Sequence, residues 1–140
     1  MGKSKISFQS VGAFSLVSEP TVIRCIKDLA KQELREIGDI TIVFCDDNYL
    51  HKINLEFLDH DTYTDVITFD YSTGNELISE IYISVDRVLE NSKKYNQTFE
   101  NEIHRVIVHG VLHLCGYKDE QEEDRQIMRD KENHYLSLFT

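Results

Sequence analysis

The sequence predicts an α+β fold in which a small mixed β-sheet packs against several helices. Three observations lead to this prediction: a strand–helix–strand order near the N-terminus, two β-rich runs joined by a short turn signal, and helical periodicity through most of the second half. The chain has 140 residues, with a single proline and six glycines, and it contains no repeat or linker-like stretch. We therefore expect one domain over residues 1–140.

The first half of the chain alternates strands and helices. Residues 6–8 form a short strand candidate, and Pro20 lies in the first turn of an amphipathic helix that is expected to stop at Gly38. The apolar positions of this helix are Val22, Ile23, Ile26, Leu29, Ala30, Leu34 and Ile37. Residues 39–45 predict a second strand, after which Asp46 or Asp47 is expected to cap a second helix.

The second half begins with a hairpin and ends in helices. The β-branched and aromatic runs 65–71 and 77–85 flank the turn signal 72–75, which predicts two antiparallel strands. Residues 86–95 predict a helix, and Thr98 is expected to cap a longer one that stops at Gly116. Residues 120–138 predict a charged surface helix. Its expected anchors are Ile127, Met128, Tyr135 and Leu138.

The composition of the chain indicates its cellular compartment and the kinds of partner that it can bind. The three cysteines are far apart, odd in number and without a C-x-x-C pair, a pattern that favours a reducing compartment. No signal peptide or membrane-length apolar run is present, so we expect a soluble, cytoplasmic protein with no membrane partner. The formal net charge of −10 disfavours non-specific binding of nucleic acid, although the acidic residues are unevenly spread.

Residues 108–119 contain the candidate metal-ligating residues. His109 and His113 are four apart in a nearly apolar helical run, so their side chains leave the same face one turn apart. Gly116 can end the helix and turn the chain back, which brings Asp119 toward the same point. Two imidazoles and a carboxylate are competent zinc ligands. The spacing predicts a metal-binding helix–turn with His109, His113 and Asp119 as ligands. Coincidental spacing of hydrogen-bonded core histidines is the alternative.

The residue after the first histidine separates this pattern from a metalloprotease. A zinc peptidase of this type needs a glutamate there as general base, and this chain has Gly110. A metal-dependent hydrolase other than a peptidase is therefore expected. The remaining histidines lack comparable partners and are interpreted as surface or locally hydrogen-bonded residues. They are His51, His60, His104 and His134.

Together with other segments, this motif resembles the YbeY family of rRNA-maturation endoribonucleases. The family pattern H-G-x-L-H-L-x-G-Y is matched by seven residues: His109, Gly110, Leu112, His113, Leu114, Gly116 and Tyr117. Residues 64–69 (TDVITF) and 80–84 (EIYIS) are similar to two strands of the family, and Asn54 and Phe57 align with the end of one of its helices. The resemblance extends over most of the chain, in the same order.

Two positions depart from the family pattern. The third metal ligand of the family is usually histidine, and here it is Asp119, which adds a negative charge and makes harder metals more competitive. An arginine that faces substrate in the family is replaced by Leu58, which cannot bind phosphate. Phosphate contacts are then expected from Lys52, Arg105 or Lys118.

The resemblance implies a metal-dependent, single-strand-specific endoribonuclease that acts in small-subunit rRNA maturation and ribosome quality control. Zinc is the expected ion, with nickel, manganese or iron as possible substitutes, and rRNA and the ribosomal small subunit are the expected partners. His109 and Asp65 are the expected catalytic residues, Asp65 either orienting a ligand histidine or assisting as a base. Two other interpretations remain open: a non-catalytic, metal-stabilised ribosome-assembly factor, and an iron oxygenase with two histidines and a carboxylate.

Overall fold

A computed structural model describes residues 5–58 and 64–139 of the chain. Four strands form one mixed sheet: β1 (Lys5–Ser10), β2 (Glu36–Cys45), β3 (Val66–Asp70) and β4 (Glu76–Ser84). Their spatial order is β1-β2-β4-β3. The β1/β2 and β2/β4 pairs are parallel, and β3 pairs with β4 antiparallel, as the turn signal between them predicts. The mixed sheet and its helices confirm the expected α+β class.

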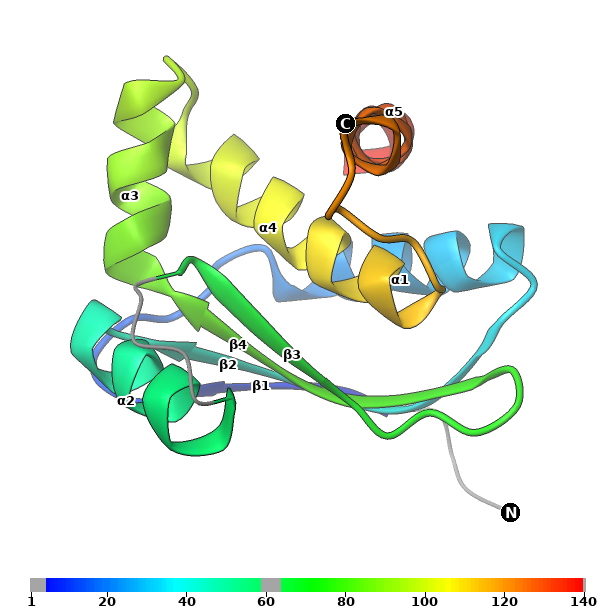
Figure 1. Ribbon diagram of the computed structural model, residues 1–140, viewed down its shortest axis with the longest axis horizontal. Coiled ribbons are helices and arrows are strands. Elements are labelled where there is room, and N and C mark those ends of the chain that lie inside the picture. Colours follow the sequence, from blue (N-terminus) through cyan, green and yellow to red (C-terminus); the bar gives the residue numbers. More distant parts are fainter. Residues whose placement is uncertain (1–4, 59–63, 140) are drawn as a thin grey trace.

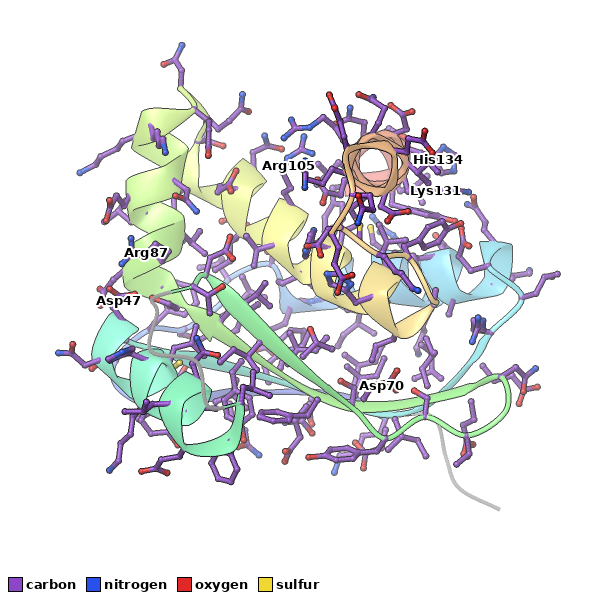
Figure 2. All side chains as sticks on the ribbon, in the orientation of Figure 1. Asp47, Asp70, Arg87, Arg105, Lys131 and His134 are labelled. Carbon is purple, nitrogen blue, oxygen red and sulfur yellow. The ribbon has the colours of Figure 1, made fainter. Side chains whose placement is uncertain are left out.

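Five α-helices surround the sheet: α1 (Glu19–Gln32), α2 (Asp47–Leu58), α3 (Val85–Lys94), α4 (Phe99–Leu114) and α5 (Glu122–Leu136), followed by the short 3-10 helix η1 (Ser137–Phe139). Figure 1 shows α1 and α4 over one face of the sheet, α2 under the other, and α5 packed outside α4. At the end where α2 and α3 begin, an ion pair between Arg87 and Asp47 (2.8 Å) joins the two helices (Figure 2).

The core follows from the alternation of side chains along the strands. Leu77, Ile81 and Ile83 of β4 point to the α1/α4 side and are fully buried in the main core. Tyr82, on the opposite face, packs with the smaller cluster under α2. Both faces of the sheet are therefore covered, and β3 is held at its edge directly beside α4.

The first helix is shorter than its apolar pattern predicts. It ends at Gln32, and Leu34 takes a left-handed conformation (φ 58°) and is 82% exposed, so this leucine is not part of the apolar face. Gly38 lies inside β2 at a register irregularity, where an added Cβ would come 2.8 Å from Glu76 Cγ. The prediction that Gly38 stops the helix was wrong, because this glycine is required by close packing within the sheet.

The last helix is anchored differently from the prediction. Met128 and Tyr135 are each 2% exposed, whereas Ile127 is 49% exposed and lies on the solvent side. The buried face runs through Met128, Glu132 and Tyr135, spaced at four and three residues, and Ile127 is one position out of this register. No helix in residues 5–58 or 64–139 is long and apolar enough to cross a membrane.

Helix α4 approaches the sheet closely because Gly110 faces it. A Cβ at Gly110 would lie 3.1 Å from Ile81 Cγ2 and 3.3 Å from Thr68 Oγ1. The N-terminus of α4 is capped as expected by Thr98, whose hydroxyl accepts a hydrogen bond from the backbone of Asn101. The close approach at Gly110 places the C-terminal half of α4 over β3 and β4.

Candidate metal centre

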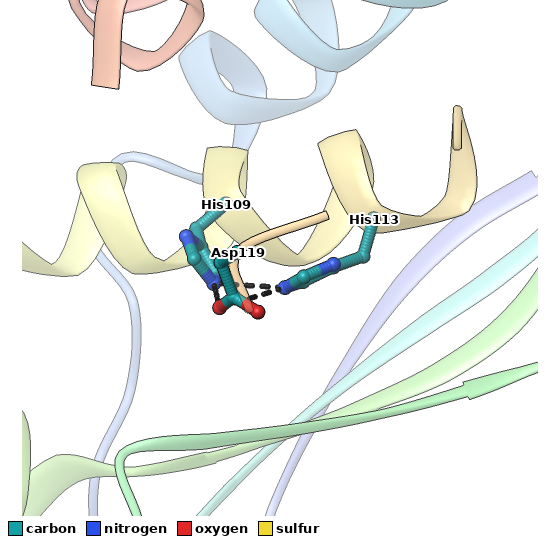
Figure 3. A group of neighbouring side chains, drawn as sticks. All are labelled: His109, His113 and Asp119. Carbon is teal, nitrogen blue, oxygen red and sulfur yellow. Dashed lines mark hydrogen bonds and ion pairs between the residues drawn. The ribbon is translucent and has the colours of Figure 1, made fainter. Parts of the chain in front are cut away.

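Three potential ligand atoms meet below the C-terminal half of α4. His109 and His113 leave α4 one turn apart, and Asp119 returns from the loop after it (Figure 3). Gly116 allows this return because it takes a left-handed backbone conformation (φ 99°) just after the helix ends. The structure thus brings together the three residues that the spacing selects, which we call the His–His–Asp cluster.

The spacing of these atoms matches one shared cation. The two Nε2 atoms are 3.0 Å apart, and Asp119 Oδ2 lies 3.2 Å from that of His109 and 3.3 Å from that of His113. Three ligands about 2.0–2.1 Å from a tetrahedral ion are separated from one another by about 3.3–3.4 Å. The cluster is close to this geometry without any change of side-chain conformation.

Hydrogen bonds on the far side of each ring determine which nitrogen faces the cluster. His113 Nδ1 lies 2.9 Å from the carbonyl oxygen of Tyr117, which can only accept, so this nitrogen carries the proton. His109 Nδ1 lies 2.7 Å from Glu132 Oε2 and donates to that carboxylate. In the neutral rings both Nε2 atoms therefore present lone pairs to each other and to a carboxylate. Such a group is repulsive until a cation lies between its members.

Glu132 is the partner that sequence analysis missed. Its side chain is only 8% exposed, and its second oxygen accepts from Arg105 at 2.9 Å. Burial alone would raise the pKa of Glu132, but the hydrogen bonds from His109 and Arg105 outweigh it and lower the pKa. A carboxylate in register with Met128 and Tyr135 on the buried face of α5 was the available signal. A metal-ligating histidine is commonly oriented by such a carboxylate.

The charges around His109 favour a cation at this ring. Burial lowers the pKa of His109, but the hydrogen bond to Glu132 and the negative charges of Glu132, Asp119 and Asp65 outweigh it, so the pKa is raised. A divalent ion at the His–His–Asp cluster would be stabilised by the same negative charges.

The loop that carries Asp119 is fixed by a second carboxylate, that of Glu33, whose side chain is 11% exposed. Glu33, between α1 and β2, accepts hydrogen bonds from the hydroxyls of Tyr117 (2.8 Å) and Tyr135 and pairs with Lys131 at 3.3 Å. The hydroxyl of Tyr117 thus ties the loop to Glu33 while its carbonyl orients His113. Tyr117 is therefore held through its side chain by Glu33, which is distant in sequence, and through its backbone carbonyl by His113 of α4.

A cavity of about 470 Å³, here the main cavity, opens beside the cluster on its β3 side. Besides the cluster, its lining residues are Asn54, Leu58, Thr64, Asp65, Val66, Ile67, Thr68 and Asp70. Asp65 lies in this cavity but does not hydrogen-bond a ligand histidine, since Glu132 takes that position. Burial raises the pKa of the Asp65 carboxyl, and the nearby His109 opposes the shift.

The other motif residues have structural roles. Ser84 caps α3 and donates to Asp47, and Cys115 is 8% exposed in the core. His104 is hydrogen-bonded to Ser18 and His134 to Gln32.

The residues expected to contact phosphate are placed less favourably. Lys52 and Lys118 are exposed and do not line the main cavity, and Arg105 is committed to Glu132 and Asn133. His51 is half-buried on α2, and His60 lies outside the described residues.

Fold and site together define a class: an α+β protein that presents two helical histidines and a loop aspartate, beside an open cavity, as a candidate metal site. Residues 14–140 match the family described as Endoribonuclease YbeY. The chain therefore belongs to the endoribonuclease YbeY family.

Relatives support this assignment over nearly the whole length. The endoribonuclease YbeY of Christiangramia forsetii is 48% identical over 139 residues, or 99% of this chain and 97% of the relative. That of Flavobacterium johnsoniae is 46% identical over 134 residues, or 96% of each chain. A Thermotoga maritima protein solved in solution has a TM-score of 0.70 and 26% identity, covering 96% of this chain and 89% of its own. The resemblance expected from the sequence is confirmed, and an endoribonuclease is favoured over a non-catalytic assembly factor.

Proposed function

We propose that this protein is a zinc-dependent, single-strand-specific endoribonuclease that acts in the cytoplasm on small-subunit rRNA. The observation that carries the proposal is the His–His–Asp cluster, in which three lone-pair donors converge within 3.3 Å while both Nδ1 atoms are held by acceptors. The family assignment supports RNA as the substrate. Maturation of rRNA on the ribosomal small subunit is the biological role that the resemblance implies.

His109, His113 and Asp119 would hold the ion. Two imidazoles and one carboxylate suit zinc, and the carboxylate also makes nickel, manganese or iron practicable substitutes. No fourth His, Cys, Asp or Glu joins the cluster within the part of the chain that the structure describes. Three protein ligands leave a coordination position open, which is typical of catalytic sites and unlike closed structural ones. When bound, the ion supplies Lewis acidity that polarises a phosphoryl oxygen and acidifies water.

The chain's own residues would orient the substrate and move a proton. Asp65 lines the same cavity as the three ligands, and we assign it as the proton acceptor for the attacking water. Glu132 and the Tyr117 carbonyl keep the two histidines in the orientation that ligation requires. The main cavity, of about 470 Å³, would receive an unpaired strand beside the three ligands.

The iron-oxygenase interpretation has less support. It needs two histidines and a carboxylate facing open positions, which this site also provides, but the family assignment favours hydrolysis. Oxygen uptake after addition of iron(II), with no RNA present, would revive it.

Metal analysis combined with a nuclease assay tests the proposal. Protein purified without chelators is compared with His113→Ala and Asp119→Ala, and with His134→Ala as a control in which a histidine remote from the cluster is removed. Wild type and the control should carry one divalent ion per chain and cut an rRNA precursor, and both cluster variants should lose ion and cleavage together. Full metal content in Asp119→Ala would show that the third ligand is wrong, and cleavage by metal-free protein would overturn the proposal.

A further inference from the structure

The described lining of the main cavity is poor in the basic side chains that an RNA strand needs. Among the described residues that line it there is no lysine or arginine, while Asp65 and Asp70 add negative charge. Binding of a nucleic-acid backbone draws much of its affinity from basic side chains that neutralise phosphates. The backbone on either side of the bond to be cut must therefore find its cations elsewhere.

A second cavity, here the α5 cavity, adjoins the cluster on its α5 side. It measures about 220 Å³ and is lined by His109, Asp119, Arg125, Met128, Arg129 and Glu132. His109 and Asp119 line both cavities, so the candidate metal site lies where the two meet. A strand that crosses the metal site from the main cavity can continue into the α5 cavity.

The two arginines of the α5 cavity are placed to receive a phosphate. Arg125 and Arg129 are four residues apart on α5, so their side chains lie on the same face one turn apart. Arg125 Nη1 donates a hydrogen bond to the carbonyl oxygen of Glu120 at 2.9 Å, which anchors the side chain. The other N–H groups of the guanidinium remain available to an anion. Within the described residues Arg129 forms no ion pair, whereas Arg105 is tied to Glu132.

The carboxylates of the α5 cavity do not cancel these charges. Glu132 is paired with Arg105 and with His109, and Asp119 belongs to the candidate metal site. The guanidinium groups of Arg125 and Arg129 thus remain available to an anion in a cavity that they share with two of the three proposed ligands. Guanidinium is suited to phosphate because its N–H groups form two parallel hydrogen bonds.

We propose that Arg125 and Arg129 form a backbone subsite that binds an RNA phosphate next to the one being cleaved. The inference rests on the proposed ribonuclease function and deepens it, since it gives the path of the RNA strand over the protein: across the metal site from the β3 side to α5. Sequence analysis missed both arginines because they lie in a strongly acidic stretch of the chain that reads as a solvated helix face.

The test is Arg125→Gln/Arg129→Gln, assayed on two substrates. One is a single-stranded RNA of about ten nucleotides, and the other is a dinucleoside monophosphate, which has the scissile phosphate and no neighbour. On the longer RNA, kcat/KM should fall about 10- to 100-fold, mostly through KM. The slope of log kcat/KM against log salt concentration should become shallower by about 0.7 for each phosphate no longer neutralised. On the dinucleoside monophosphate the variant should equal wild type, and its metal content should be unchanged.

A matched control is Arg24→Gln/Lys27→Gln, which removes two charges from exposed positions of α1 that are not among the lining residues of the main cavity or the α5 cavity. A fall on the longer RNA no greater than that of this control would overturn the subsite while leaving the proposed function intact. An equal loss on both substrates would also overturn it, because the arginines would then act at the scissile phosphate or on the fold. If wild type with its ion cuts neither substrate, the proposed function fails and the subsite fails with it.

Discussion

His109 Nδ1 donates a hydrogen bond to Glu132 Oε2 across 2.7 Å, and this contact joins α4 to α5 directly behind the candidate metal site. The acceptor is buried and is also bound by Arg105, so neither its position nor its charge can vary freely. The bond places the proton of His109 on the outer nitrogen and directs the lone pair of Nε2 at the ion.

Glu132→Gln should therefore weaken metal binding without removing a ligand. Loss of an orienting partner of this kind typically costs 10- to 100-fold in metal affinity. Competition with a fluorescent zinc chelator measures the effect. Glu102→Gln is the control, because Glu102 is a buried carboxyl on α4 with no hydrogen-bonded histidine. Equal zinc affinity in the two variants would show that Glu132 has only a packing role.

Glu33 should make the free energy of unfolding decrease as the pH falls into the acid range. Burial raises the pKa of Glu33, but hydrogen bonds from Tyr135 and Tyr117 and the charge of Lys131 outweigh it, so the folded-state pKa is lowered. A lowered pKa means that the contribution is fully present above the unfolded-state value, about 4.5, and is lost as pH falls through the folded-state value. Urea unfolding from pH 7 to pH 3 should show this loss in wild type.

In Glu33→Gln the free energy of unfolding at pH 7 should be lower by about 1–3 kcal/mol, and the difference from wild type should shrink toward pH 3. The exposed Glu36→Gln serves as control and should track wild type throughout. A difference for Glu33→Gln that stays constant across this range would assign the effect to packing.

The sequence was sufficient for local features and insufficient for partners that only the fold brings together. The hairpin, the Thr98 cap and the cluster depend on residues within a few positions of one another, and the structure contains them as predicted. Glu33 and Glu132 could not be assigned in the same way. They reach the site from segments some 84 and 23 residues away from their partners Tyr117 and His109.

Errors in the helix boundaries have a similar origin. The apolar repeat that runs on to Ile37 reads as one helix, but Ile37 already pairs with Leu77 in the sheet. Periodicity alone cannot distinguish an extended helix from a helix followed by a buried strand. Gly38 was interpreted as a helix stop for the same reason, since the close approach of Glu76 is visible only in three dimensions.

Asp119→His should keep the ion and change its preference. A third imidazole replaces a hard, charged oxygen, so binding of zinc relative to manganese should increase, and the ribonuclease activity supported by manganese should decline. Asp119→Asn, which removes the charge and offers only a weak amide ligand, should lose affinity for both ions. Isothermal titration with each ion measures the ratio. An unchanged zinc-to-manganese ratio in Asp119→His would argue against ligation through this position.

The hydroxyl of Thr68 should lower the stability of the fold. Its Oγ1 is buried and, within the residues that the structure describes, has no hydrogen-bond partner, although it lies in the lining of the main cavity. A buried unpaired hydroxyl is costly, so Thr68→Val should raise the free energy of unfolding by about 1 kcal/mol. Thr41→Val is the matched control, because the Thr41 hydroxyl has Ser7 as its partner at 3.3 Å and its loss should lower stability instead. Thermal unfolding of both variants checks the two signs, and a destabilised Thr68→Val would mean that its hydroxyl is satisfied in solution.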